Sequence, residues 1–242
     1  MENLNKPIGY APDRQLSATV ARTYLSGVFM WMFIALGITA ATAWLFATTP
    51  ELISVLHNPE TGGMSITGWI VMLAPLGIVI WMSAGYRKLS ASSMLMIFVL
   101  FSILMGASLS FIFLTFTGAS IAKTFVITAA MFGFMAVLGY TTKTDLTKFG
   151  SIMYMGLIGL IIASLVNMFT QSSTMDYIIS FIGVLVFTGL TAYDVQKLKR
   201  IGAQLTEEGE NTRKMTIMGS LTLYLDFINL FLFLLRFLGN RR

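Results

Sequence analysis

The sequence predicts an all-α integral membrane protein, and three observations support that fold class. Of its 242 residues, 56% are hydrophobic and only 11% are charged, whereas an average soluble domain carries about 25% charged residues. The apolar residues gather in seven runs, each long enough to form a helix across a hydrocarbon core of about 30 Å. No polar block is long enough for a second, soluble domain. We therefore expect residues 25–242 to form one transmembrane domain.

The chain begins with a polar segment, residues 1–24. Met1 to Ala21 include Pro7, Pro12 and charges of both signs, and they lack the apolar core of a cleavable signal peptide. We expect this segment to stay on the protein as a cytoplasmic tail.

The seven runs follow in order, and the first six contain no Asp, Glu, Lys or Arg. The seventh differs, because it holds Asp226 near its middle and Arg236 near its end. The expected spans are Leu25–Phe46, Ile66–Ala84, Met94–Thr115, Thr124–Tyr140, Ile152–Phe169, Tyr177–Tyr193 and Met215–Leu238.

The positive charges predict which side of the membrane the N-terminus occupies. Lys and Arg accumulate in cytoplasmic loops, and an N-in orientation puts twelve of the 16 positive residues there. We therefore expect the N-terminus to be cytoplasmic. Because these charges are scattered over short loops, they do not predict nucleic-acid binding. The twelve are Lys6, Arg14, Arg22, Arg87, Lys88, Lys143, Lys148, Lys197, Lys199, Arg200, Arg213 and Lys214.

The C-terminus leaves two alternatives open. Seven complete spans put Arg236, Arg241 and Arg242 outside, against the charge rule. Either the positive charges of the other loops outweigh these three arginines in setting the orientation, or the last segment enters the membrane and returns without crossing it. We expect seven complete spans.

Small residues recur at helical spacing in two of the spans. Helix backbones approach each other closely in lipid at such residues, so we interpret both sets as packing seams and assign them no chemistry. They are Ser102, Gly106 and Ser110 in the third span, and Gly156, Gly159, Ala163 and Asn167 in the fifth.

Asp226 is the residue that most needs an explanation. An Asp at the centre of a membrane helix costs roughly 2.5 to 3.5 kcal/mol, and such residues usually face the bundle interior or a water-filled pathway. Its own helix offers only Thr222 and Asn229 as supporting polar groups on the same face. We therefore expect Asp226 to have a function.

Asp194, at the end of the sixth span, has two interpretations. It is either an interfacial acid beside Lys197, Lys199 and Arg200, or the partner of Asp226. Two carboxylates in contact cannot both ionise cheaply, so such a pair shares a proton and titrates as a unit. The pair would sense pH and, when deprotonated, offer the oxygen ligands that a passing Ca²⁺ prefers.

Other chemistry is not indicated by the sequence. It contains no cysteine, so disulfides and thiolate metal sites are excluded. Signatures such as GxSxG, HExxH or a phosphate-binding loop are missing, so we expect neither an enzyme nor a bound cofactor. Arg87 ends the second span, where it either anchors the helix at the interface or folds back toward the carboxylates as a latch.

Two segments resemble the Bax inhibitor-1 family of membrane proteins. They are SLTLYLDFINLFLFLLRFLG, from Ser220 to Gly239, and TAYDVQKLKR, from Thr191 to Arg200. The resemblance implies six helices around a central seventh and a pH-sensitive calcium leak pathway with calcium as the transported ion. It also implies that Asp194 and Asp226 are the family's paired-aspartate sensor.

The sequence departs from the family pattern in two places. Some members carry a second-span arginine that latches the pore, but Ser83 stands at that position, and Arg87 one turn later is the candidate replacement. The segment LTEEGENTRK, residues 205–214, lengthens the connection between the two aspartates and is a place for regulation from the cytoplasmic side.

Three functions remain open at this point. The first is a pH-gated, calcium-permeable leak of the Bax inhibitor-1 type. The second is a regulator that binds other membrane proteins, such as a membrane protease, through its tail. The third is proton-coupled transport of a small solute, for which a carboxyl pair suffices. The absence of a targeting signal favours a bacterial inner membrane.

Overall fold

The computed structural model describes residues 11–56 and 63–240, with side chains from residue 19 onward. Every regular element in these ranges is a helix, and seven stretches are long and apolar enough to cross a membrane, as predicted. The helices are α1 (Ala11–Thr48), α2 (Pro50–Leu56), α3 (Ile66–Gly85), α4 (Ala91–Leu109), α5 (Ile112–Thr115), α6 (Gly118–Thr141), α7 (Thr147–Thr170), α8 (Ser173–Gln204) and α9 (Glu210–Leu238).

The first helix begins earlier than the apolar pattern predicts. Helix α1 starts at Ala11, so part of the expected tail, residues 11–24, is helical. The rest of the tail, residues 1–10, lies outside the described residues, and its binding to a partner stays a prediction.

Hydroxyl side chains mark the starts of four helices. Each accepts a hydrogen bond from the backbone N–H three residues later, which satisfies one of the free donors of the first turn. The four capping residues are Ser65 of α3, Ser90 of α4, Thr117 of α6 and Ser172 of α8.

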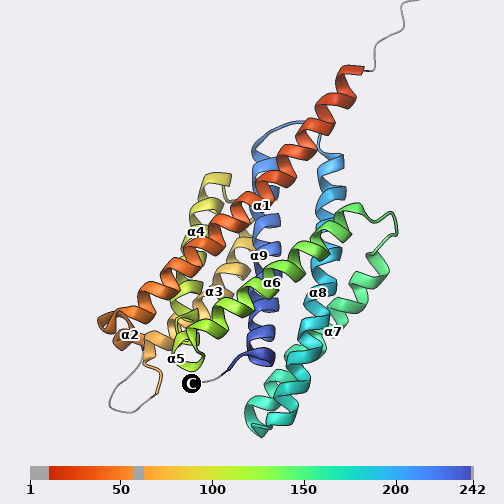
Figure 1. The fold of residues 1–242 in the computed structure, drawn as a ribbon. Coiled ribbons are helices and arrows are strands. Elements are labelled where there is room, and N and C mark those ends of the chain that lie inside the picture. Colours follow the sequence, from red (N-terminus) through yellow and green to blue (C-terminus); the bar gives the residue numbers. More distant parts are fainter. Residues whose placement is uncertain (1–10, 57–62, 241–242) are drawn as a thin grey trace, which may run out of the picture.

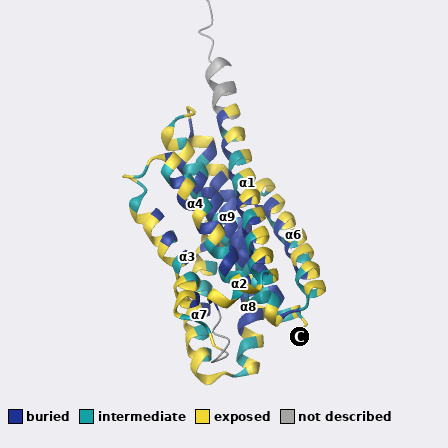
Figure 2. Ribbon diagram, turned by 90° about the vertical axis from the view of Figure 1, so that its left-hand side faces the viewer, coloured by how far each residue is buried: buried dark blue, intermediate teal, exposed yellow. Residues whose placement is uncertain are grey.

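Helix α9 runs through the middle of the bundle, as the resemblance implies (Figure 1). It packs against α8, α1, α6 and α4. We compared the buried share of one apolar 18-residue stretch in each helix. It is 61% in α8 and 56% in α9, but only 11% in α7. The buried residues of α9 are at the centre in Figure 2. The antiparallel pair of α8 and α9 is therefore the core, and α7 is peripheral.

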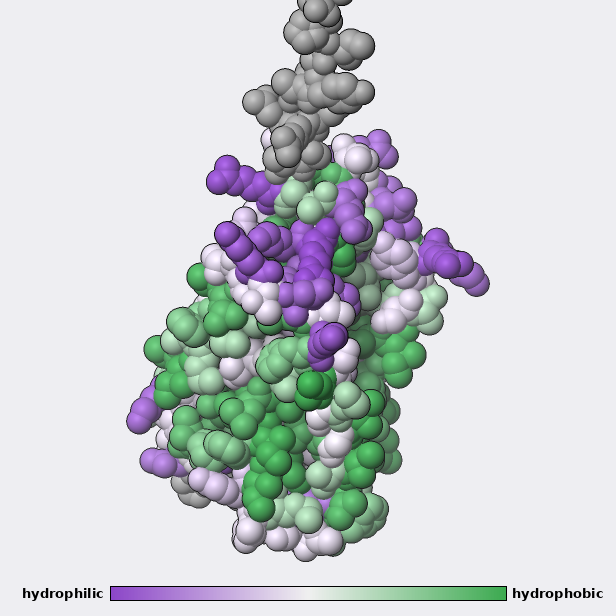
Figure 3. Space-filling view, turned by 90° about the vertical axis from the view of Figure 1, so that its right-hand side faces the viewer, coloured by the Kyte–Doolittle hydropathy of each residue, from purple (hydrophilic) through white to green (hydrophobic). Residues whose placement is uncertain are grey.

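Hydrophilic side chains gather at the end of the molecule where α1 begins, above a broad apolar belt (Figure 3). This end carries the connections between α3 and α4, α6 and α7, and α8 and α9. We call it the predicted cytoplasmic end, because the positive charges assign it to that side.

Helix α9 is continuous and ends on the opposite side of the bundle (Figure 1). The two residues that follow α9 in the chain contact the start of α6. Asn240 accepts from the Thr117 backbone N–H at 3.3 Å and donates its own N–H to the Ser120 hydroxyl at 2.9 Å. The last segment therefore crosses the bundle completely and does not return.

One of the two predicted packing seams is confirmed. Ser102, Gly106 and Ser110 are buried, and a Cβ on Gly106 would lie 2.6 Å from the Thr39 carbonyl oxygen of α1. The α7 stripe packs less completely. Gly156 approaches Val186 of α8, but Gly159 has open space and lines a groove of about 540 Å³ between α7 and α8.

The tightest helix approach involves Gly139 of α6. A Cβ there would overlap the Ala192 carbonyl oxygen of α8, two residues before Asp194. Only a residue without a side chain lets α6 come this close.

We expect Gly139→Ala to destabilise the bundle by about 1 to 3 kcal/mol, because the added methyl forces α6 and α8 apart. Gly133→Ala is the matched control, since a Cβ there meets no atom within 4 Å and alanine favours a helix. Thermal unfolding followed by circular dichroism in detergent measures both. Equal stability of the two variants would contradict the tight contact.

Candidate functional site

The structure brings Asp194 and Asp226 together at the centre of the α8–α9 pair. The two residues are 2% and 4% exposed, and their carboxyl groups lie close enough to interact directly. A hydrogen bond between two carboxyl groups needs a proton on one of them. The arrangement is therefore a buried acid pair in which the two groups can share one proton.

Both helices extend beyond the spans that hydropathy predicts, which explains how the two residues meet. The sixth apolar run stops at Tyr193, but α8 continues to Gln204. The seventh run begins at Met215, but α9 already begins at Glu210. Asp194 consequently lies inside a helix and is buried inside the bundle.

Asp226 has one oxygen without a protein donor. Its Oδ2 is buried, and no N–H or O–H group among the described residues donates to it. A buried carboxylate oxygen without a donor is costly. A proton shared with Asp194, or a cation bound between the two side chains, would remove that cost.

Tyr154 of α7 adds a third polar group that the sequence analysis missed. Its hydroxyl donates to Asp194 Oδ1 at 3.4 Å, and its ring packs edge-on against Tyr193, with 6.0 Å between ring centroids. A tyrosine near the start of an apolar span is common at membrane interfaces. Nothing in the spacing along the chain therefore points to a contact with Asp194.

The two predicted supporting residues of α9 bond to their own helix. The Thr222 hydroxyl donates to the Met218 carbonyl at 3.0 Å, and the Asn229 side chain donates to the Leu225 carbonyl at 2.8 Å. Neither hydrogen bond supports Asp226. Thr222 does line the cavity beside Asp194.

Arg87, the candidate latch, lies in the turn after α3 with an exposed side chain. In the described part of the chain it has neither a hydrogen bond nor an ion pair with an aspartate, and Ser83 is also exposed. Lys197, one turn along α8, lines the same cavity as Asp194.

A cavity of about 260 Å³ leads from Asp194 toward the predicted cytoplasmic end. Asp194 and Lys197 supply its charged groups, while Asp226 is not part of its wall. Access to the acid pair from this side is therefore through Asp194. The remaining wall residues are Tyr24, Tyr86, Leu198, Ile201, Met215, Met218, Gly219 and Thr222.

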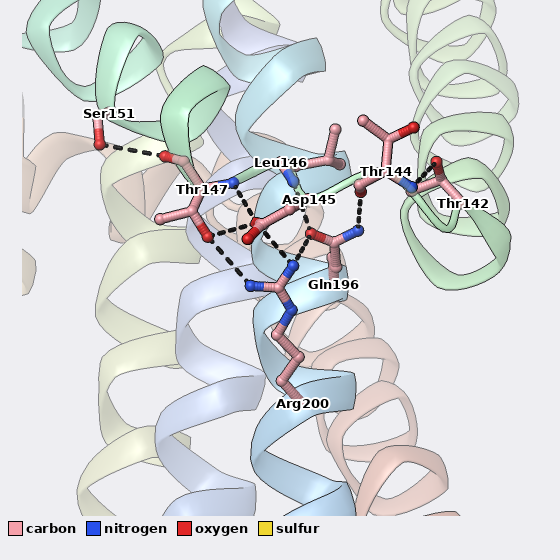
Figure 4. A network of polar contacts seen from close by, with 8 residues as sticks. All are labelled: Thr142, Thr144, Asp145, Leu146, Thr147, Ser151, Gln196 and Arg200. Atoms are coloured by element: carbon pink, nitrogen blue, oxygen red, sulfur yellow. Dashed lines mark hydrogen bonds and ion pairs between the residues drawn. The ribbon is translucent and has the colours of Figure 1, made fainter.

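A polar network holds α8 next to the site (Figure 4). Two residues after Asp194, the Gln196 amide donates to the Thr144 carbonyl at 2.8 Å and accepts from the Leu146 N–H at 2.9 Å. Arg200 binds Asp145 at 2.7 Å and the Gln196 amide oxygen at 2.8 Å. These contacts fasten the connection between α6 and α7 to α8.

The opposite ends of α8 and α9 are also tied together. Arg236 pairs with Asp176 at 3.4 Å between Nη1 and Oδ1, and its guanidinium lies 5.9 Å from the Phe233 ring centroid. Polar contacts therefore hold α8 on both sides of the acid pair.

These features define a class, a seven-helix integral membrane protein with an acid pair buried between its two central helices. Comparison of sequences gives the family. Residues 21–242 match the family described as inhibitor of apoptosis-promoting Bax1, and the chain belongs to this Bax inhibitor-1 family. Neither the family nor the fold is that of a known enzyme family.

Relatives cover nearly the whole chain. The Inner membrane protein YbhL of Escherichia coli (strain K12) is 50% identical over 222 residues, which are 91% of this chain and 93% of YbhL. An uncharacterized protein of Borreliella burgdorferi is 44% identical over 92% of this chain and 94% of its own. An uncharacterized protein of Rickettsia prowazekii is 44% identical over 91% of each chain.

We expect Asp145→Asn to lower the thermal midpoint by the same amount at about pH 5 and about pH 8. Hydrogen bonds from Thr147, and then from Arg200, hold the pKa of Asp145 well below its usual range. A lowered pKa stabilises the fold above the unfolded-state value and loses that effect only as pH falls toward the folded-state value.

Thermal unfolding at the two pH values checks this prediction. Glu207→Gln, which removes an exposed carboxylate outside the network, is the control and should leave the midpoint unchanged. A loss for Asp145→Asn that differs between the two pH values would mean that the network itself titrates there.

Proposed function

We propose that this protein is a pH-gated, calcium-permeable leak channel in which the Asp194–Asp226 pair is both the proton sensor and a transient cation site. The observation that carries the proposal is the close approach of these two buried aspartates, of which Asp194 lines a cavity. In their protonated form the two carboxyl groups bind each other. In their ionised form they repel each other and attract a cation.

The small number of oxygen ligands at the aspartate pair supports passage of Ca²⁺ rather than its stable binding. Ca²⁺ takes six to eight oxygen ligands in proteins, and two carboxylates supply at most four. Among the described residues there is no group of three or more His, Cys, Asp or Glu side chains that could hold a metal. A cation at this pair would keep most of its water and leave readily, as conduction requires.

The route from the predicted cytoplasmic end reaches Asp194 first, so proton and cation access begin there. Tyr154 donates to the same carboxyl group and stabilises its ionised form. Lys197 lines the cavity one turn away and weakens the pull of Asp194 on cations. We propose that these two side chains set the pH range in which the pair responds.

We also propose that the protein lies in the bacterial inner membrane with its N-terminus in the cytoplasm. The name of YbhL supports the compartment, and the distribution of Lys and Arg supports the orientation. Proton-coupled transport of a small solute uses the same carboxyl pair, and the response to a proton gradient distinguishes it from a leak.

We expect Asp226→Asn to abolish the pH dependence of calcium flux. Asparagine has the shape of a protonated aspartate and cannot ionise, so flux should stay at the wild-type acid-side value at every pH. Vesicles with the reconstituted full chain and a trapped calcium dye measure this. Asn229→Ala is the control on the same helix and should keep the pH response.

Two outcomes would contradict the channel. Calcium flux indifferent to both pH and Asp226→Asn removes the gating mechanism. Flux that follows a proton gradient across the vesicle membrane, but not the pH when it is equal on both sides, assigns the pair to proton-coupled transport.

We expect Tyr154→Phe to move the pH midpoint of calcium flux upward by less than about one pH unit, because one weak hydrogen bond to the ionised carboxyl is lost. Tyr140→Phe is the matched control, since the Tyr140 contacts with Lys199 use its backbone carbonyl and its ring. An unchanged midpoint in Tyr154→Phe would show that the hydroxyl does not act on the pair.

A further inference from the structure

A second, separate cavity lies at the predicted cytoplasmic end. It has a volume of about 370 Å³ and is enclosed by α1, α4, the start of α9 and the connection between α8 and α9. This volume falls in the range of small-molecule sites, about 300 to 1,000 Å³. Neither Asp194 nor Asp226 lines it, so a ligand in this cavity is independent of the proposed function.

A direct contact holds the connection between α8 and α9 in place as one wall of the cavity. The Glu210 carboxylate accepts the backbone N–H of Ala91, the first residue of α4, at 2.6 Å. An acceptor at this position satisfies a free donor of the first turn and favours the helix dipole. The wall that carries Glu208 and Arg213 is therefore fastened to α4.

The lining changes from polar to apolar along the cavity. On α1 the lining extends from Val20 to Trp31, which is a helix length of about 16 Å at 1.5 Å per residue. Glu208, Thr212 and Arg213 come from the connection and the first turn of α9, at the polar end of the molecule. Trp31 and Leu95 form the apolar part. This polarity matches a molecule with a charged head and an apolar tail.

The two charged side chains of the lining have opposite signs. In the described part of the chain, neither Glu208 nor Arg213 has a side-chain hydrogen bond or an ion pair, and both are exposed. A guanidinium matches a phosphate with paired N–H donors. A carboxylate accepts hydrogen bonds from a primary ammonium, which a quaternary ammonium cannot donate.

We infer that this cavity binds a zwitterionic glycerophospholipid with a primary ammonium head group. Arg213 binds the phosphate, Glu208 binds the ammonium, and an acyl chain lies against Trp31 and Leu95. Tyr24 lines both this cavity and the one that reaches Asp194, so the lipid would lie directly beside the wall of the second cavity.

The experiment is a lipid titration of the purified full chain in detergent, read by native mass spectrometry. The three lipids are phosphatidylethanolamine, phosphatidylcholine and phosphatidylglycerol with identical acyl chains. We expect the wild type to bind phosphatidylethanolamine about threefold to fivefold more tightly than the other two, the effect of one exposed charge pair.

Two variants separate the roles of the head-group contacts. Glu208→Gln should remove the preference for the primary ammonium over the quaternary one. Arg213→Gln should lower the affinity for all three lipids by about threefold to fivefold. Ser92→Trp, at an exposed position of the lining, should block binding by filling the cavity.

Glu207→Gln and Arg22→Gln make the same charge changes at exposed residues that do not line the cavity, and they should bind as the wild type does. Thermal unfolding confirms that every variant is folded. Equal binding of the three lipids by the wild type, or unchanged binding in both Glu208→Gln and Arg213→Gln, overturns the inference.

Discussion

The contact between Asp194 and Asp226 is the interaction on which the rest of the bundle depends. Two unscreened negative charges at this depth would repel each other strongly in a medium of low dielectric constant. The protein must therefore hold α8 and α9 at one separation, at which a proton or a cation can lie between the carboxyl groups. A small displacement of either helix would leave a buried carboxylate without a partner.

Small residues and polar ties maintain that separation. Gly139 and Gly150 let α6 and α7 approach Ala192 and Tyr193, and Gly183 receives the ring of Phe233 from α9. Beyond this packed region, Gln196 and Arg200 fasten α8 to the connection before α7, and Arg236 fastens α9 to the start of α8. Polar contacts thus lie near the two ends of the helix pair, and close backbone packing lies between them.

The sequence was sufficient for the fold class and the seven spans, and it singled out Asp226, because hydropathy and an isolated acid in an apolar helix are both local signals. It did not predict how far α8 and α9 continue beyond the apolar runs, since polar residues such as Gln196 find their partners on other helices. Tyr154 was missed for the same reason. From the sequence, Arg200 and Arg236 were interpreted only as positive charges at the ends of spans, but each forms an ion pair with a segment far away in the chain.

The peripheral position of α7 has a consequence for how the protein responds to its surroundings. This helix contributes the Tyr154 hydroxyl to the acid pair, yet most of its surface faces outward, and a groove separates part of it from α8. Acyl chains of the bilayer therefore complete the packing of the helix that carries the donor. In the proposed mechanism, membrane thickness and lateral pressure would act on the position of α7 and, through Tyr154, on the proton affinity of the acid pair. Extraction into detergent micelles would change that influence.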